Sequence, residues 1–443
     1  ADLAYEPYKA YNDFKRQGLI DINERKICYE ILYKYENEGA YLNLALKQGL
    51  CAAEPQSRGF CTEAVYGVVR NRLFLDAKIS AYSKIKLKKL SLPVLIILRL
   101  ALYELYFMES GHDYAVINES VKLSKKYAYK SSGFINGVLR SACERREKAY
   151  PDNIKYSFPD SIYNKICAQY GENAPHIFKE LNEKKPVSIR QNALKIPKDE
   201  LIRLFGGNCA EEYGRLFVKG GIDTEYFKKG FFSVSGAASQ GAVEALSPQK
   251  DEKILDCCAA PGGKTAYIAE IMGNTGEITA MELHPHRCEL IKENLKRLGI
   301  TNTSVKCHDA SAKIDEFCGY FDRVICDAPC SGWGVIPTKP DIKWRETDTK
   351  ELAEIQKKIL ETVALYVKHG GILVYCTCTI NKEENEEITD EFLRKNPEFE
   401  PIPFEINIDG EIFGADGRAV ILPEKNHTGF YICKLKRRGK NGK

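Results

Sequence analysis

The chain has 443 residues, of which 44% are hydrophobic and 28% charged, and this is enough material for two or three domains. No apolar run approaches the length of about 18 residues that marks a membrane span, and no charged-then-apolar leader opens the chain. We therefore expect a soluble, cytoplasmic protein without a membrane partner, and Ala1 in place of Met suggests a trimmed or partial N-terminus.

Charge is unevenly distributed along the chain. Lys and Arg outnumber Asp and Glu in residues 1–150, whereas the remainder is slightly acidic. The N-terminal part is thus a candidate nucleic-acid surface, although a solvated lysine-rich surface explains the same excess.

The 16 cysteines form no C-x-x-C pair and show no zinc-site spacing. We expect reduced thiols, most of them small buried side chains and one or two reactive, and we predict that no metal is required.

Residues 1–20 form a polar extension about which the sequence says little, and residues 21–146 have apolar positions at helical spacing throughout. We predict an all-α bundle in which the apolar helix that Pro93 opens runs through the middle. Nothing in this part resembles a catalytic constellation.

Residues 147–235 contain Pro151, Pro159 and Pro186, which break the pattern into shorter pieces. We predict a small α+β linker subdomain here. Arg190 is a candidate phosphate contact, although an exposed arginine usually has no specific partner.

Strand and helix patterns alternate from residue 236 to residue 435, which predicts a parallel, doubly wound α/β domain. The C-terminal strand pattern at 429–435 reads as an added edge strand, and residues 436–443 as a basic tail. The predicted strands are 253–257, 277–281, 303–307, 322–326 and 371–376, and the predicted helices are 264–272, 286–298 and 350–368.

The stretch Asp251–Thr265, DEKILDCCAAPGGKT, predicts a buried strand, a glycine-rich turn and a helix N-terminus. Such a turn lets the backbone approach a ligand, and Glu282, at the end of the next strand, can accept hydrogen bonds from ribose hydroxyls. The loop matches neither G-x-G-x-x-G nor a P-loop, so a small adenosine-containing ligand is favoured over a dinucleotide. A plain tight turn is the alternative.

Two further strands end in thiols. The runs FDRVICDAPCSG and GILVYCTCT carry Cys330 and Cys378 past their ends, with Asp327 close by, and the single helix between them predicts neighbouring parallel strands. A thiolate that adds to C6 of a pyrimidine makes C5 nucleophilic enough to accept a methyl group, and a carboxyl group can hold the N3/N4 edge of an extruded base.

Two family resemblances follow from these motifs. The segments EGAYLNLAL, EAVYG, ILRLALYEL, AVINE and GFINGVLR resemble the NusB-like RNA-binding module, and residues 230–435 resemble the catalytic domain of the RNA cytosine-C5 methyltransferases. Together they resemble the bacterial Sun/Fmu-type 16S rRNA cytosine-5 methyltransferases, which implies a Rossmann-like methyltransferase domain behind a NusB-like domain.

The resemblance also implies roles for individual residues. S-adenosylmethionine would be the methyl donor, Glu282 would hold its ribose, Asp309 would lie by the adenine and Asp327 near its methionine end and the target base. Cys378 matches the nucleophile of the family and Cys330 the cysteine that helps to release the product, although the sequence alone does not decide which thiol attacks. The turn that would embrace the donor consists of Cys258, Ala259, Ala260, Pro261, Gly262, Gly263 and Lys264.

Three positions depart from the family pattern. Glu282 replaces the more frequent Asp, Ser235-Gly236 a usual Gln-Asp, and Pro337-Thr338 a usual basic pair before KPDIKW. The expected function is methyl transfer to C5 of a cytosine in small-subunit rRNA by a monomer. Two alternatives stay open: a tRNA substrate, or a non-catalytic RNA-binding or ribosome-assembly factor.

Overall fold

The computed structural model describes residues 22–53, 57–108, 112–145, 148–222 and 224–439. The extension 1–20 and residues 440–443 of the basic tail lie outside this part. The chain forms two compact units: a helical unit up to Asn182 that also contains Lys339–Arg345, and a sheet unit formed by the rest. Among the described residues, no helix is both long enough and apolar enough to cross a membrane.

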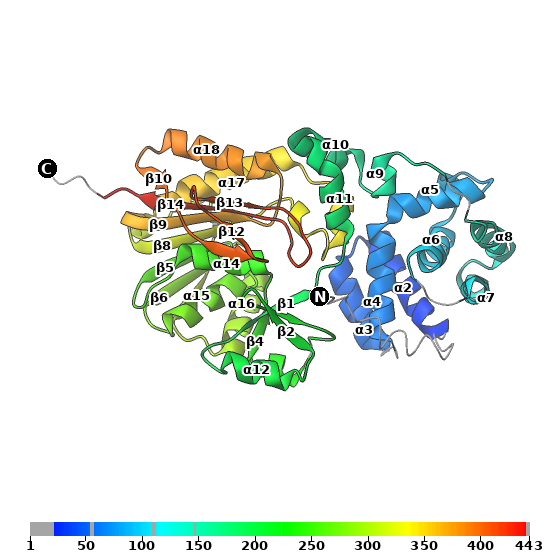
Figure 1. Ribbon diagram of the computed structural model, residues 1–443, viewed down its shortest axis with the longest axis horizontal. Helices are drawn as coiled ribbons and strands as arrows, with labels where there is room; N and C mark the ends of the chain where they lie inside the picture. Colours follow the sequence, from blue (N-terminus) through cyan, green and yellow to red (C-terminus); the bar gives the residue numbers. More distant parts are fainter. Residues whose placement is uncertain (1–21, 54–56, 109–111, 146–147, 223, 440–443) are drawn as a thin grey trace. The chain divides into compact units, whose positions relative to one another are not determined.

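The helical unit has the all-α architecture that the sequence predicts (Figure 1). Two of the breaks between consecutive helices fall at Gly39, whose φ of +64° is rarely adopted by other residues, and at Asn71. The larger helices are α2 (Ile22–Glu38), α3 (Leu42–Ala53), α4 (Arg58–Arg70), α5 (Arg72–Tyr82), α6 (Leu92–Phe107), α7 (Asp113–Tyr127), α8 (Ser132–Ala142), α10 (Asp160–Tyr170) and α11 (Ala174–Asn182).

Helix α6 is the centre of this unit, as predicted. Every residue from Ile96 to Leu105 is buried, and the helix packs against α2, α4, α5, α7 and α8. Its Pro93 occupies the first turn, where a missing N–H has no consequence.

The segment Lys339–Arg345, which carries the KPDIKW motif, belongs to the helical unit. Lys343 is 2% exposed, and its Nζ donates to the carbonyl oxygens of Arg70 and Ser157 at 3.1 and 3.2 Å and to Oδ1 of Asn182 at 2.6 Å. Burial lowers the pKa of Lys343 well below its ordinary value. The boundaries drawn from the sequence do not anticipate this division, because 147–235 and 236–435 each contribute residues to both units.

The sheet unit is built on an eight-stranded sheet in the order β10-β14-β9-β8-β5-β6-β7, with β13 (Arg418–Ile421) paired to β14. The five predicted strands are confirmed, and they run parallel to one another. They are β5 (Lys253–Cys257), β6 (Glu277–Glu282), β7 (Thr303–Cys307), β8 (Phe321–Asp327) and β9 (Val367–Thr377).

Helices cover both faces of this sheet (Figure 1). Helices α17 (Thr349–Ala364) and α18 (Glu386–Lys395) pack on the face formed by Leu255, Val324 and Leu373. Helices α14 (Ala237–Leu246) and α15 (Gly263–Met272) pack on the opposite face, with α16 (Pro285–Leu298) beside α15. The doubly wound α/β architecture is therefore confirmed, and so is the Rossmann-like domain that the resemblance implies.

Two element predictions for the sheet unit are wrong in detail. β14 (Phe430–Arg437) is not an edge strand, because it runs antiparallel between β9 and β10 (Phe399–Pro401). The predicted helix 350–368 ends at Ala364, and β9 already begins at Val367.

A small antiparallel sheet in the order β2-β3-β1-β4 precedes the large one. Arg190, on β1, is not a phosphate contact. Its side chain is 5% exposed, forms an ion pair with Glu270 of α15 and lies over the Tyr267 ring at 4.4 Å. The predicted α+β character is present, and its strands are β1 (Val187–Gln191), β2 (Cys209–Glu212), β3 (Arg215–Val218) and β4 (Phe232–Val234).

Candidate active site

The carboxyl ends of the parallel strands bring the predicted site residues to one edge of the large sheet. Cys257 on β5 pairs with Cys326 on β8, and Asp327 pairs with Cys376 on β9. The neighbouring parallel strands expected for β8 and β9 are therefore confirmed. The turns that follow β5, β8 and β9 carry the glycine motif, Cys330 and Cys378.

The turn after β5 has the backbone that a close-fitting ligand loop requires. Cys258 adopts φ +64° although it is not glycine, and Gly262 adopts φ +90°. A Cβ at Gly262 would lie 3.2 Å from Cγ2 of Ile291, so a larger residue there would crowd α16. Helix α15 begins at Gly263, and no side chain caps its first turn.

Lys264 and Asp327 join this turn to the end of β8. The Nζ of Lys264 donates to Oδ2 of Asp327 at 2.6 Å, and the two side chains are 12% and 29% exposed. Burial alone would lower the pKa of Lys264, but the charge and hydrogen bond of Asp327 and the other acidic groups nearby together outweigh it, and the pKa is raised. The two side chains thus form an ion pair at the rim of the candidate site, where both are partly exposed to solvent.

The other predicted cofactor residues lie at the ends of β6 and β7. Glu282 is 2% exposed, and its Oε1 accepts from the backbone N–H of His284 at 3.1 Å and from Arg287 at 3.3 Å. Asp309 is exposed, and its Oδ1 accepts from the N–H of Ser311 at 2.8 Å, a bond that lowers its pKa.

The two predicted catalytic thiols meet. The Sγ atoms of Cys330 and Cys378 are 3.4 Å apart, and both residues are partly accessible. The hydrogen bond to Cys378, together with burial, raises the pKa of Cys330 well above its ordinary value. A group held in this way remains a neutral thiol that can donate a proton to its neighbour.

Sequence reasoning missed the side chains beneath the thiols. Glu384, Thr379 and Gln356 are fully buried and connect the two thiol-bearing turns. Glu384 gave no signal, since the run KEENEE is typical of a solvated helix start. The position of this run a few residues after Cys378 was the one available cue.

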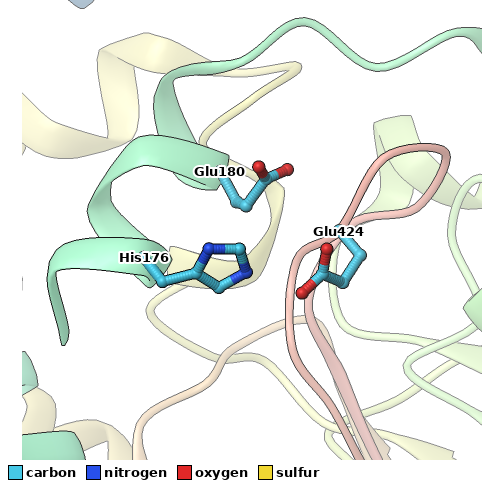
Figure 2. A group of neighbouring side chains, drawn as sticks. All are labelled: His176, Glu180 and Glu424. Carbon is cyan, nitrogen blue, oxygen red and sulfur yellow. The ribbon is translucent and has the colours of Figure 1, made fainter. Parts of the chain in front are cut away.

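His176 and Glu180 lie one turn apart on α11, where Figure 2 shows them with Glu424. The first two belong to the helical unit and Glu424 to the sheet unit. Two side chains on one helix are fewer than the ligands of an ordinary protein metal site. The expectation that no metal is required stays a prediction.

Family models match two parts of the chain: "NusB family" over residues 22–144 and "16S rRNA methyltransferase RsmB/F" over residues 243–436. The chain is 38% identical to the "Probable ribosomal RNA small subunit methyltransferase B" of Bacillus subtilis (strain 168), over 94% of this chain and 99% of the relative. It is 32% identical to the protein of the same name from Synechocystis sp., over 94% and 100%.

A solved structure titled "Crystal Structure of PH0851" has the same fold. It superposes with a TM-score of 0.80 at 24% identity and covers 94% of this chain and 99% of its own. Both family matches and the near-complete coverage lead to one conclusion. This chain belongs to the ribosomal RNA small subunit methyltransferase B family, a family of S-adenosylmethionine-dependent methyltransferases.

Proposed function

We propose that the chain methylates C5 of a cytosine in 16S rRNA through a covalent adduct between Cys378 and C6 of the flipped base. The observation that carries the proposal is the 3.4 Å approach of the Cys330 and Cys378 Sγ atoms beside the Lys264–Asp327 pair. The names of the relatives support rRNA as the substrate class.

The methyl donor fits the turn after β5. The left-handed Cys258 and Gly262 and the uncapped start of α15 leave backbone N–H groups available to a ligand, as in other nucleoside-binding turns. Glu282 would hold the ribose, Asp309 would lie by the adenine, and the turn Cys258–Lys264 would enclose the remainder. The donor supplies an electrophilic methyl group.

The two thiols divide the remaining chemistry. Cys378 loses its thiol proton to solvent and adds to C6 as a thiolate, which makes C5 a nucleophilic enamine carbon, and Asp327 holds the N3/N4 edge of the base during the addition. After the methyl group has moved to C5, the C5 proton leaves to a base, which we take to be water. The Cys378–C6 bond then breaks by elimination. Cys330, held as a neutral thiol, donates a proton as Cys378 leaves.

The test compares Cys330→Ala and Cys378→Ala in the full chain, with tritiated S-adenosylmethionine and either 16S rRNA or tRNA. We expect Cys330→Ala to accumulate a labelled protein–RNA adduct that survives a denaturing gel. Cys378→Ala should give neither adduct nor methylated RNA.

Other outcomes would overturn specific parts of the proposal. The reverse pattern would exchange the roles of the thiols. A clear preference for tRNA would overturn the choice of substrate. A wild-type protein that binds RNA but labels none would favour a binding or assembly factor.

A further inference from the structure

The two thiol-bearing turns are joined beneath the surface by one carboxylate. Glu384 lies on the 3-10 turn η7 (Lys382–Glu384) and is 0% exposed. Its Oε2 accepts from the backbone N–H of Ser331 at 2.8 Å, and Ser331 follows Cys330 directly in the chain. This hydrogen bond fixes the end of the Cys330 turn.

The same carboxylate also holds the second turn. Its Oε1 accepts from Nδ2 of Asn381 at 2.9 Å, and the backbone N–H of Asn381 donates to Oγ1 of Thr379, the residue after Cys378, at 3.2 Å. The carboxylate therefore contacts the Cys330 turn directly and the Cys378 turn through one intermediate residue.

Two further contacts close the network. Gln356 of α17 donates from one Nε2 to Oε2 of Glu384 at 3.0 Å and to the carbonyl oxygen of Pro329 at 2.7 Å. The hydroxyl groups of Ser331 and Thr379 lie 2.8 Å apart. The residues directly after the two cysteines thus contact each other, with Glu384 beneath them.

We propose that Glu384 is a positioning residue that sets the distance between the Sγ atoms of Cys330 and Cys378. The backbone N–H of Ser331 and the side-chain amides of Gln356 and Asn381 all donate to its carboxylate, so a neutral amide in its place would present an N–H group to at least one donor. The two turns then lose their common anchor. The effect of Glu384 on the distance between the two thiols does not depend on the proposed function. The effect of that distance on catalysis rests on the proposed function.

The experiment compares wild type with Glu384→Gln and uses Glu391→Gln as the matched control. Glu391 undergoes the same chemical change, but it pairs with Lys357 and Lys395 on the outer side of α17 and α18. The probe is phenylarsine oxide, which bridges two thiols only when they are close together. Peptide mass spectrometry identifies the bridged Cys330–Cys378 pair, and iodoacetamide labelling shows whether each thiol remains accessible.

We expect the arsenical to bridge the pair in wild type and in Glu391→Gln. In Glu384→Gln, bridging should fall at least several-fold while both thiols still react with iodoacetamide. The kcat of methyl transfer should fall by about 10²-fold, as for a displacement of about 1 Å, with KM for RNA and affinity for S-adenosylmethionine within about twofold of wild type. Glu384→Asp keeps the charge on a shorter arm and should fall between the two.

Unchanged bridging and unchanged kcat in Glu384→Gln would overturn the proposal. If Glu384→Gln does not fold, Gln356→Met provides the second test, since it removes one bridge and leaves the carboxylate in place. It should weaken bridging in the same direction by a smaller factor, and bridging equal to wild type would overturn the proposal. A wild type that methylates no RNA would overturn the proposed function, and the bridging assay would still decide the role of Glu384.

Discussion

Two buried ionic networks of the helical unit and one buried carboxylate of the sheet unit have different surroundings. In the core of the helical unit, Arg99 donates to both oxygens of Asp76 and of Glu36 and is 4% exposed at its side chain, and Arg25 pairs with Glu104 at 2.7 Å. At the carboxyl edge of the sheet unit, Asp256 is fully buried and its Oδ1 has no partner. Charges with complete sets of partners stabilise a fold, whereas an incompletely satisfied carboxyl group with a shifted pKa next to a candidate site is typical of a reacting site.

The largest effect is expected at Asp327. Asp327→Asn replaces the negative partner of Lys264 with a neutral amide and, in the proposed mechanism, weakens the hold on the N3/N4 edge of the base. The kcat of methyl transfer should fall by about 10²- to 10⁴-fold. Single-turnover transfer from tritiated S-adenosylmethionine to 16S rRNA measures the change.

Asp322→Asn is the matched control for this prediction. Asp322 is the second residue of the same strand, at the end opposite to Asp327, and it also pairs with a lysine, Lys368, at 2.6 Å. Its substitution should leave kcat within about twofold. Retention of more than a tenth of the wild-type rate in Asp327→Asn would place this carboxylate outside the chemistry.

The next effect is on stability. Arg99→Met leaves Glu36 and Asp76 without their shared cation, and breaking such a buried pair costs about 3–5 kcal/mol of unfolding free energy. Urea unfolding followed by circular dichroism at the helical signal measures the loss. The kcat of the folded fraction should stay near wild type, because the reacting groups lie in the sheet unit.

Arg140→Met, at an exposed position of α8, supplies the comparison and should change stability by less than about 0.5 kcal/mol. If both variants unfold alike, the Arg99 network does not stabilise the helical unit. If Arg99→Met lowers kcat instead of stability, the distinction between the two kinds of buried charge fails.

The sequence predicted the sheet unit well where the pattern is local. β5 to β9 are short apolar runs that end in polar or thiol residues, so their positions and common edge follow from periodicity and from the crossover rule. The place of β14 did not follow, because alternation along one strand says nothing about which strands lie on either side of it. Arg190 was misjudged for a related reason: its partner, Glu270, is 80 residues away in the chain.

The sequence predicted the partly exposed residues of the candidate site but not the buried residues beneath them. The motifs marked Cys330, Cys378 and Asp327 as candidates, and the structure brings the two thiols together. Glu384 and Gln356 join turns that are distant in the chain, and a buried glutamate within KEENEE has no local mark of burial. Lys339–Arg345 likewise belongs to the helical unit because of long-range contacts, such as the hydrogen bond from Lys343 to Asn182.

The smallest predicted effect concerns pH. Burial raises the pKa of Asp256 to about 7, against the weaker opposing influence of its hydrogen bond from Thr265. Because this folded-state pKa lies above the ordinary value of 3.8, the folded chain binds the proton more tightly than the unfolded chain does. The wild type should therefore lose stability as the pH rises from about 4 to about 7, by at most about 4 kcal/mol.

Asn at position 256 cannot ionise, so the stability of Asp256→Asn should not fall over this pH range, and its Tm relative to that of wild type should rise between about pH 4 and about pH 7. Asp309→Asn is the control at the same edge of the sheet. Because the pKa of Asp309 is lowered, its titration lies below pH 5 and its Tm curve should run parallel to wild type. If the Asp256→Asn curve is also parallel, burial does not raise the pKa of Asp256, and the contrast between Arg99, with its complete set of partners, and the incompletely satisfied Asp256 fails.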